Sequence, residues 1–156
     1  MVQEFIRKAT PDDVEYLIAN VRPEDVEEVD ALDGSTIRES MEELPDLETT
    51  QAWEVDGKIV CLFGVTPVPG FDGMGAIWML ATKDFDKYTR LFPARSKEVI
   101  AEAARQYNYI FNYVHSKNVK SISWLEWLGF TCGEPEPIGH KGEMFTKFEM
   151  KTCAIQ

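Results

Sequence analysis

Basic residues are scarce in this chain relative to acidic ones, and the shortage limits the partners that it can have. Among 156 residues there are 16 lysines and arginines against 27 aspartates and glutamates, so the formal net charge is −11. Binding to nucleic acids depends on cations that neutralise phosphates, and anionic membrane surfaces repel a chain this acidic. We therefore expect neither a nucleic acid nor a membrane as a partner.

Long apolar runs and a cysteine framework are also missing. The longest apolar run, at about residues 59–65, is far shorter than the ~20 residues that span a bilayer. The first residues lack the charged segment and the apolar segment of a secretory signal. The three cysteines, Cys61, Cys132 and Cys153, are odd in number and lack the spacing of a metal site. These features predict free thiols and a cytoplasmic protein.

The last four residues allow two interpretations. The sequence Cys-Ala-Ile-Gln at 153–156 matches the cysteine-aliphatic-aliphatic-X signal for prenylation. Such anchors usually have a polybasic stretch beside them, because a single lipid chain binds membranes only marginally. Here the neighbouring basic residues are Lys147 and Lys151. The alternative is the end of a strand that carries an incidental cysteine.

Hydrophobic periodicity predicts a single domain over residues 1–156, with strands and helices in a definite order. Apolar residues recur with the helical period in some segments and alternate or run together in others, while Asp56-Gly57 is a preferred pair for a tight hairpin turn. The expected strands are 5–9, 51–55, 58–65, 76–81, 109–114, 130–132 and 144–151, and the expected helices are 10–21, 23–33, 36–44, 93–106 and 118–128. This order predicts an α+β sandwich, with helices on both faces of a mixed, mostly antiparallel sheet.

The last of these strands is expected to lie inside the sheet. Met144, Thr146, Phe148 and Met150 are two residues apart, and charged residues alternate with them from Lys147 onward, so they should share one face of the strand.

Both the order of elements and the segment 118–130 resemble the GNAT superfamily, the GCN5-related N-acetyltransferases. In that segment Asn118 follows a strand, Ser121 comes three residues later, and Gly129-Phe130 closes the helix. Asparagine caps the free N–H groups of a helix, and glycine permits the left-handed turn that ends one. The amino-acid sequence of residues 111–114 is also similar to that of acetyltransferase-like internal virion proteins of T7-type phages.

The resemblance implies acetyl-CoA as cofactor and an amine, small or on a protein, as acceptor. The strands near 76–81 and 109–114 would part at their C-terminal ends, and the pantetheine would pair there with the backbone of Leu80 and Thr82. The pyrophosphate would lie at residues 94–96. Ala94 and Ser96 are small enough to let phosphates approach a helix N-terminus, and Arg95 can add a charged contact.

Residues 93–96 also differ from the GNAT pattern for binding pyrophosphate. The expected glycines are replaced by Ala94 and Ser96, and Pro93 removes one N–H donor. An ordinary helix start with proline in its first turn is the alternative interpretation.

The catalytic side chains that the resemblance implies are mostly absent. Leu125 stands where the general-acid tyrosine would be, and leucine cannot donate a proton. His115, at a strand end, has a suitable pKa for a base, although a structural histidine is the alternative. Asn118 is the other residue that the resemblance places at the site. The acidic run 24–30 is typical of a solvated helix face, while the resemblance would let it border a cationic amine.

Two functions remain open at this point. The first is an acyl-CoA-dependent N-acyltransferase that transfers acetyl to an amine, which Asn118 and the small residues at 94 and 96 favour. The second is a non-catalytic protein of the same fold in phage morphogenesis or host interaction, with a second copy or a phage protein as partner. The missing tyrosine and the altered phosphate segment favour the second.

Overall fold

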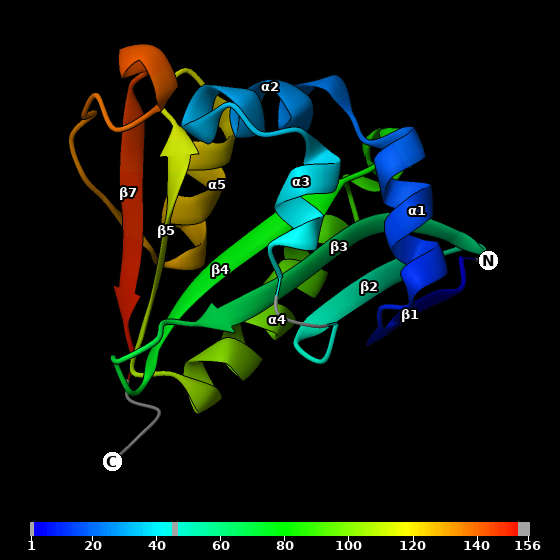
Figure 1. Cartoon of the computed structure of the whole chain (residues 1–156). Coiled ribbons are helices and arrows are strands. Elements are labelled where there is room, and N and C mark those ends of the chain that lie inside the picture. Colours follow the sequence, from blue (N-terminus) through cyan, green and yellow to red (C-terminus); the bar gives the residue numbers. More distant parts are fainter. Residues whose placement is uncertain (1, 45–46, 153–156) are drawn as a thin grey trace.

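The computed structural model describes residues 2–44 and 47–152. Its strands form one seven-stranded sheet in the order β1-β2-β3-β4-β5-β7-β6 (Figure 1). All neighbouring strands are antiparallel except β4 and β5, which are parallel. The strands are β1 Glu4–Lys8, β2 Thr50–Val55, β3 Lys58–Pro67, β4 Met74–Ala81, β5 Tyr109–His115, β6 Thr131–Cys132 and β7 Phe145–Lys151.

Helices cover both faces of this sheet. In Figure 1, α1, α2 and α3 lie in front of the sheet, while α4 and α5 lie behind it. The α-helices are α1 Pro11–Asn20, α2 Pro23–Asp33, α3 Ile37–Glu42, α4 Phe92–Gln106 and α5 Val119–Leu128, and the 3-10 helices are η1 Lys83–Tyr88 and η2 His140–Gly142. The expected α+β sandwich is thus confirmed, and η1 and η2 were not predicted. No helix among the described residues is long and apolar enough to cross a membrane.

The segment that carries the resemblance has the expected local structure. The Oδ1 atom of Asn118 accepts a hydrogen bond of 3.2 Å from the N–H of Ser121 at the start of α5. Gly129 ends the helix with φ 108°, in the left-handed region that glycine adopts without strain. Phe130 then enters the core, where it packs edge-on against Phe148. The cap and the turn explain why the helix occupies these residues.

Replacing Asn118 by alanine should lower the stability of the protein modestly. The variant loses the side-chain acceptor at the start of α5, and such losses cost about 1 kcal/mol. For a chain of this size we expect the melting temperature to fall by roughly 2–4 °C. Thermal unfolding followed by circular dichroism measures this, and an unchanged midpoint would show that the cap contributes nothing.

The C-terminal strand lies inside the sheet, as predicted. β7 pairs with β5 on one side and β6 on the other. The expected face needs one correction, because Met144 precedes the strand and is exposed, while Phe145 is fully buried. Phe148 is buried as expected. The prenylation signal at 153–156 lies outside the described residues.

The parallel pair β4 and β5 separates partway along its length, which creates a gap in the sheet. Pairing covers Met74–Ala76 of β4 and Tyr109–Phe111 of β5, after which the two strands diverge (Figure 1). At the point of separation, the Nδ2 atom of Asn112 donates a hydrogen bond of 2.7 Å to the carbonyl oxygen of Ile77. The predicted parting of these strands is confirmed, and an asparagine side chain ends their pairing.

Candidate active site

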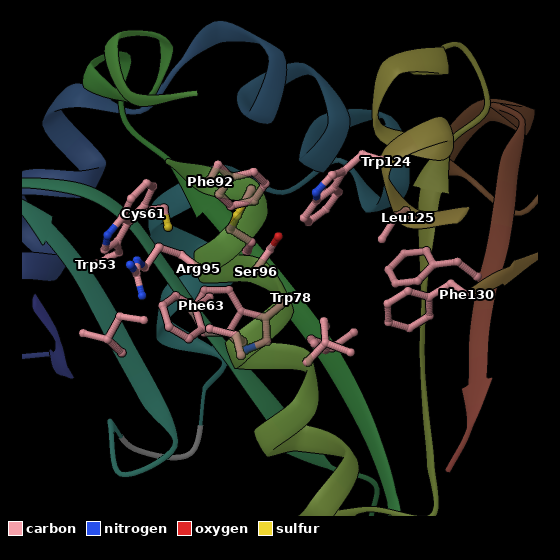
Figure 2. A pocket seen from close by; sticks show the side chains of 16 residues that line it. Trp53, Cys61, Phe63, Trp78, Phe92, Arg95, Ser96, Trp124, Leu125 and Phe130 are labelled. Atoms are coloured by element: carbon pink, nitrogen blue, oxygen red, sulfur yellow. The ribbon is translucent and has the colours of Figure 1, made fainter. Parts of the chain in front are cut away.

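Two cavities meet in the gap between β4 and β5. One, here called the rear cavity, has a volume of about 100 Å³ and lies on the side of α4 and α5 (Figure 2). The other, here called the front cavity, has a volume of about 200 Å³ and lies beneath α2. Because the same side chains line both, the cavities adjoin. The shared residues are Ile77, Trp78, Met79, Trp124, Leu125 and Phe148.

The edge of β4 offers backbone groups to this gap at Met79. The N–H of Thr82 donates to the carbonyl oxygen of Val60 in β3, whereas the backbone of Ala81 bonds to α2 on the opposite side. Backbone groups of a strand alternate between its two neighbours, so Met79 faces the gap and Leu80 faces β3. Since β5 has already diverged, no strand of the described chain pairs with Met79 there.

This register changes the expectation for Leu80 and Thr82. Leu80 directs its backbone to β3, where its partner is Leu62. The Thr82 hydroxyl is fully buried and donates to the carbonyl oxygen of Ile59 at 2.8 Å. A ligand that pairs with the open edge of β4 would therefore contact Met79, one residue before Leu80.

Helix α2 closes the wide end of the gap. The Oδ2 atom of Asp25 accepts a hydrogen bond of 2.6 Å from the N–H of Ala81 at the end of β4. One turn later, Oε1 of Glu28 accepts a hydrogen bond of 2.6 Å from the N–H of His115 at the end of β5. Arg22 binds Oδ1 of Asp25 at 3.0 Å. Two carboxylates on one helix thus fasten it to both separated strands.

Both carboxylates have raised pKa values. Burial raises the pKa of Asp25, against the opposing effect of the Arg22 guanidinium. Burial likewise raises the pKa of Glu28, and the hydrogen bond from the His115 N–H opposes it only in part. Glu28 lines the front cavity, so it has the position and the pKa shift of a group that could accept a proton there.

The acidic run of α2 therefore has two faces. Glu24 and Glu27 are exposed, as expected for a solvated helix face. That expectation is wrong for Asp25 and Glu28, which face the sheet. The available signal was helical spacing, because Asp25 lies four residues before apolar Val29 and Glu28 lies four residues before apolar Leu32.

The two residues expected to be catalytic lie outside both cavities. The Nε2 atom of His115 lies 3.1 Å from Oε2 of Glu143, and its ring packs edge-on against Phe145. Asn118 uses its side chain to cap α5. Leu125, at the position of the missing tyrosine, does line both cavities. Roles for His115 and Asn118 in catalysis remain predictions.

The expected phosphate segment starts α4 but is surrounded by acids. Ala94 is exposed, and the Ser96 hydroxyl donates to the carbonyl oxygen of Pro93 at 2.9 Å. The guanidinium of Arg95 contacts a Glu98 carboxylate at 2.7 Å, and its Nε atom lies 2.9 Å from Oε1 of Glu4. A bound phosphate would have to compete with these two carboxylates for Arg95.

Aromatic rings cover the rear cavity beside this helix start. The ring of Phe92 lies 4.7 Å from that of Trp124 and 4.8 Å from that of Phe85, between centroids. The nearby thiol of Cys61 is buried, and burial raises its pKa to about 12, so it is a neutral part of the wall. Among the described residues, no group of three or more side chains could hold a metal ion.

Solved structures with the same fold are GNAT-type acetyltransferases. A GNAT-family acetyltransferase from Streptococcus pneumoniae is 15% identical, with a TM-score of 0.68 over 96% of this chain and 99% of that one. A ribosomal-protein-alanine N-acetyltransferase from Brucella melitensis is 16% identical, with a TM-score of 0.70 over 94% of this chain and 99% of that one.

A spermidine N-acetyltransferase from Vibrio cholerae, solved with CoA and spermine, is 8% identical. Its TM-score is 0.72, over 96% of each chain. No protein-family model and no curated protein sequence matches the chain. At these identities the likeness establishes the fold, which is that of the GNAT acetyltransferases.

Proposed function

We propose that the chain is an acyl-CoA-dependent N-acyltransferase, which transfers the acetyl group of acetyl-CoA to an amine. The observation that carries the proposal is the gap between β4 and β5, with an open backbone edge at Met79. Pantetheine is an extended chain with amide groups, so it can pair with such an edge as an added strand would. The Vibrio cholerae neighbour, solved with CoA and spermine, supports the same use of the fold.

The acceptor that suits the front cavity is a cationic amine. Glu28 lines this cavity, and the exposed carboxylates Glu24, Glu27 and Asp30 lie on the same helix. The negative field of these groups attracts cations and opposes anionic acceptors. A small polyamine or a lysine-like side chain has the required charge and a primary amine.

The residues around the gap can then take separate roles in the reaction. Bound acetyl-CoA supplies the thioester that the amine attacks. Glu28 takes the proton from the entering ammonium, since its raised pKa makes it a better base than an ordinary glutamate. Met79 holds the donor in the gap, and Tyr113, which also lines the front cavity, is the candidate to protonate the leaving thiolate. Holding both reactants in place contributes the rest.

Calorimetry with acetyl-CoA tests this proposal. We expect weak binding, with a Kd of ~0.01–1 mM, because carboxylates surround Arg95. Arg95→Glu should abolish binding, since it replaces the one cation at the start of α4 that faces the rear cavity. The matched control is Arg105→Glu, which breaks a similar ion pair with Glu102 at the far end of the same helix. If the wild type gives no heat of binding at millimolar acetyl-CoA, the proposed acyltransferase function is contradicted.

The second candidate is a non-catalytic protein of this fold, in phage morphogenesis or host interaction. Leu125 in the gap and the Phe92–Trp124 contact beside the helix start favour it, because both oppose catalysis or cofactor entry. Under this alternative, acetyl-CoA gives no heat and no amine releases CoA. The calorimetric experiment therefore separates the two functions.

A further inference from the structure

The rear cavity is larger than an acetyl group needs. Its volume of about 100 Å³ is roughly two-thirds of that of an engineered ~150 Å³ apolar cavity that stays dry and binds benzene, a six-carbon ligand. By proportion it suits about four carbon atoms, the number in a butyryl group, whereas an acetyl group has two. Its walls are almost entirely apolar, and they include Ile6, Trp53, Phe63, Val99 and Ile100. Such a space favours an aliphatic chain over water.

A hydrogen-bond donor without a partner lies where this cavity meets the gap. The Nε1 atom of Trp124 is buried and has no hydrogen-bond partner among the described residues. Figure 2 shows its indole reaching into the cavity between Phe92 and Leu125. Buried donors are almost always paired, so an unpaired one here calls for an acceptor supplied by a ligand. A carbonyl oxygen is the simplest acceptor with an apolar chain attached.

We infer that the rear cavity binds the tail of a short aliphatic acyl group, of about four carbons, with Trp124 donating to its carbonyl oxygen. The inference rests on the proposed function and deepens it, since the preferred donor becomes a butyryl-type thioester rather than acetyl-CoA. The transfer itself is unchanged. The bond from the acyl carbon to sulfur breaks and the bond to the amine nitrogen forms. The ammonium gives one proton to Glu28, and the leaving thiolate takes a proton from Tyr113, which regains it from the nitrogen as the amide forms.

Thioesters without coenzyme A test the cavity apart from the proposed function. S-methyl thioacetate and S-methyl thiobutyrate are titrated into protein labelled with ¹⁵N in its indoles, and the Trp124 signal is identified by its loss in Trp124→Phe. Each buried methylene contributes about 0.8 kcal/mol, or about fourfold. Two more methylenes should therefore make thiobutyrate bind ~15-fold tighter than thioacetate. S-methyl thiooctanoate should bind no tighter than thiobutyrate, because its tail exceeds the cavity.

A filled cavity should remove this preference. Val99→Phe places a ring in the rear cavity from α4 and should bring the two affinities to within about twofold. The matched control is Val68→Phe, the same change at a half-buried valine in the β3–β4 loop, which lines neither cavity. If Val99→Phe does not fold, the comparison in the wild type still decides. A wild-type ratio near one, or a ratio that survives in folded Val99→Phe, overturns the inference.

The remaining outcomes separate the parts of the argument. Trp124→Phe, titrated through the indole signals of Trp53 and Trp78 in the same cavity, should bind both thioesters more weakly by an equal factor, about 2–12-fold for one hydrogen bond. Unchanged affinity would overturn the role of Trp124. Tighter binding with every added methylene up to thiooctanoate would place the tail outside this cavity. A clear preference for thiobutyrate without any binding of acetyl-CoA would support the cavity and contradict the coenzyme part of the proposed function.

Discussion

Replacing Glu28 by glutamine should remove most of the acyl transfer while leaving the protein folded. The glutamine oxygen can still accept the N–H of His115, so α2 stays fastened to β5. The variant loses the carboxylate that would take the ammonium proton, and general-base catalysis contributes about 10²–10⁴-fold to a rate. Release of CoA thiol, with acetyl-CoA as donor and spermidine as the probe amine, measures the change.

Two comparisons isolate the role of Glu28 as a base. Acetyl-CoA affinity should be unchanged, because Glu28 lines the front cavity and Met79 carries the open edge. Glu27→Gln, one residue away and exposed, removes the same charge from the helix surface and should change the rate little. Equal losses in the two variants would mean that the field of α2 matters and that no proton moves to Glu28.

The difference in stability between Glu28→Gln and the wild type should change with pH in a definite direction. Burial raises the pKa of Glu28 in the folded state above its ordinary value of 4.5. As pH rises from the unfolded to the folded pKa, the unfolded state loses its proton first, so the wild type loses stability over that window. Glutamine does not titrate, so the stability of the variant should increase relative to that of the wild type as pH rises above about 4.5.

Melting temperatures from pH 4 to pH 8 measure this gain. Asp25, whose pKa is also raised, titrates in both proteins, so the difference between them reports on Glu28. A difference that stays constant with pH would show that burial of this carboxylate has no energetic consequence.

Local rules were sufficient to predict most of the fold. Asp56 and Gly57 both have positive φ, 49° and 80°, as the predicted tight hairpin turn requires. Thr10 and Asn118 cap their helices because the capping contacts span only three residues. Such features depend only on residues close together in the sequence, so they can be predicted from the sequence alone. The 3-10 helix η1 was missed because its bonds depend on Thr82, which β3 holds in place.

The site was harder to predict, because it depends on register and on contacts between distant segments. Alternation along β4 was readable, but whether Met79 or Leu80 faces the gap depends on pairing with β3. Glu28 becomes a partly buried carboxylate bonded to the sheet only where α2 meets the end of β5. A polar residue in an apolar strand was the one available signal for Asn112, which marks where the strands part. Trp124 gave no signal, since its unpaired donor exists only in the packed structure.

Replacing Asp25 by alanine should cause the largest loss of stability among these variants. Asp25 is 5% exposed, and it binds both the Arg22 guanidinium and the N–H of Ala81. Its removal leaves the guanidinium and the N–H buried without this partner, and breaking a buried pair typically costs about 3–5 kcal/mol. At 2–4 °C per kcal/mol, the melting temperature should fall by roughly 6–20 °C. Chemical denaturation and thermal unfolding measure both quantities.

Further variants distinguish the effect of the Asp25 charge from the effect of its hydrogen bond, which holds α2 to β4. Glu24→Ala, at an exposed neighbour of Asp25, should change stability by no more than about 0.5 kcal/mol. Asp25→Asn keeps an oxygen for the Ala81 N–H and should lose less than alanine does. The double variant Arg22→Met with Asp25→Leu should recover much of the loss, because apolar replacements of a buried pair are often neutral. If Asp25→Ala were as stable as the wild type, α2 would not be held across the gap by this carboxylate, and the front cavity would lose the wall that positions Glu28.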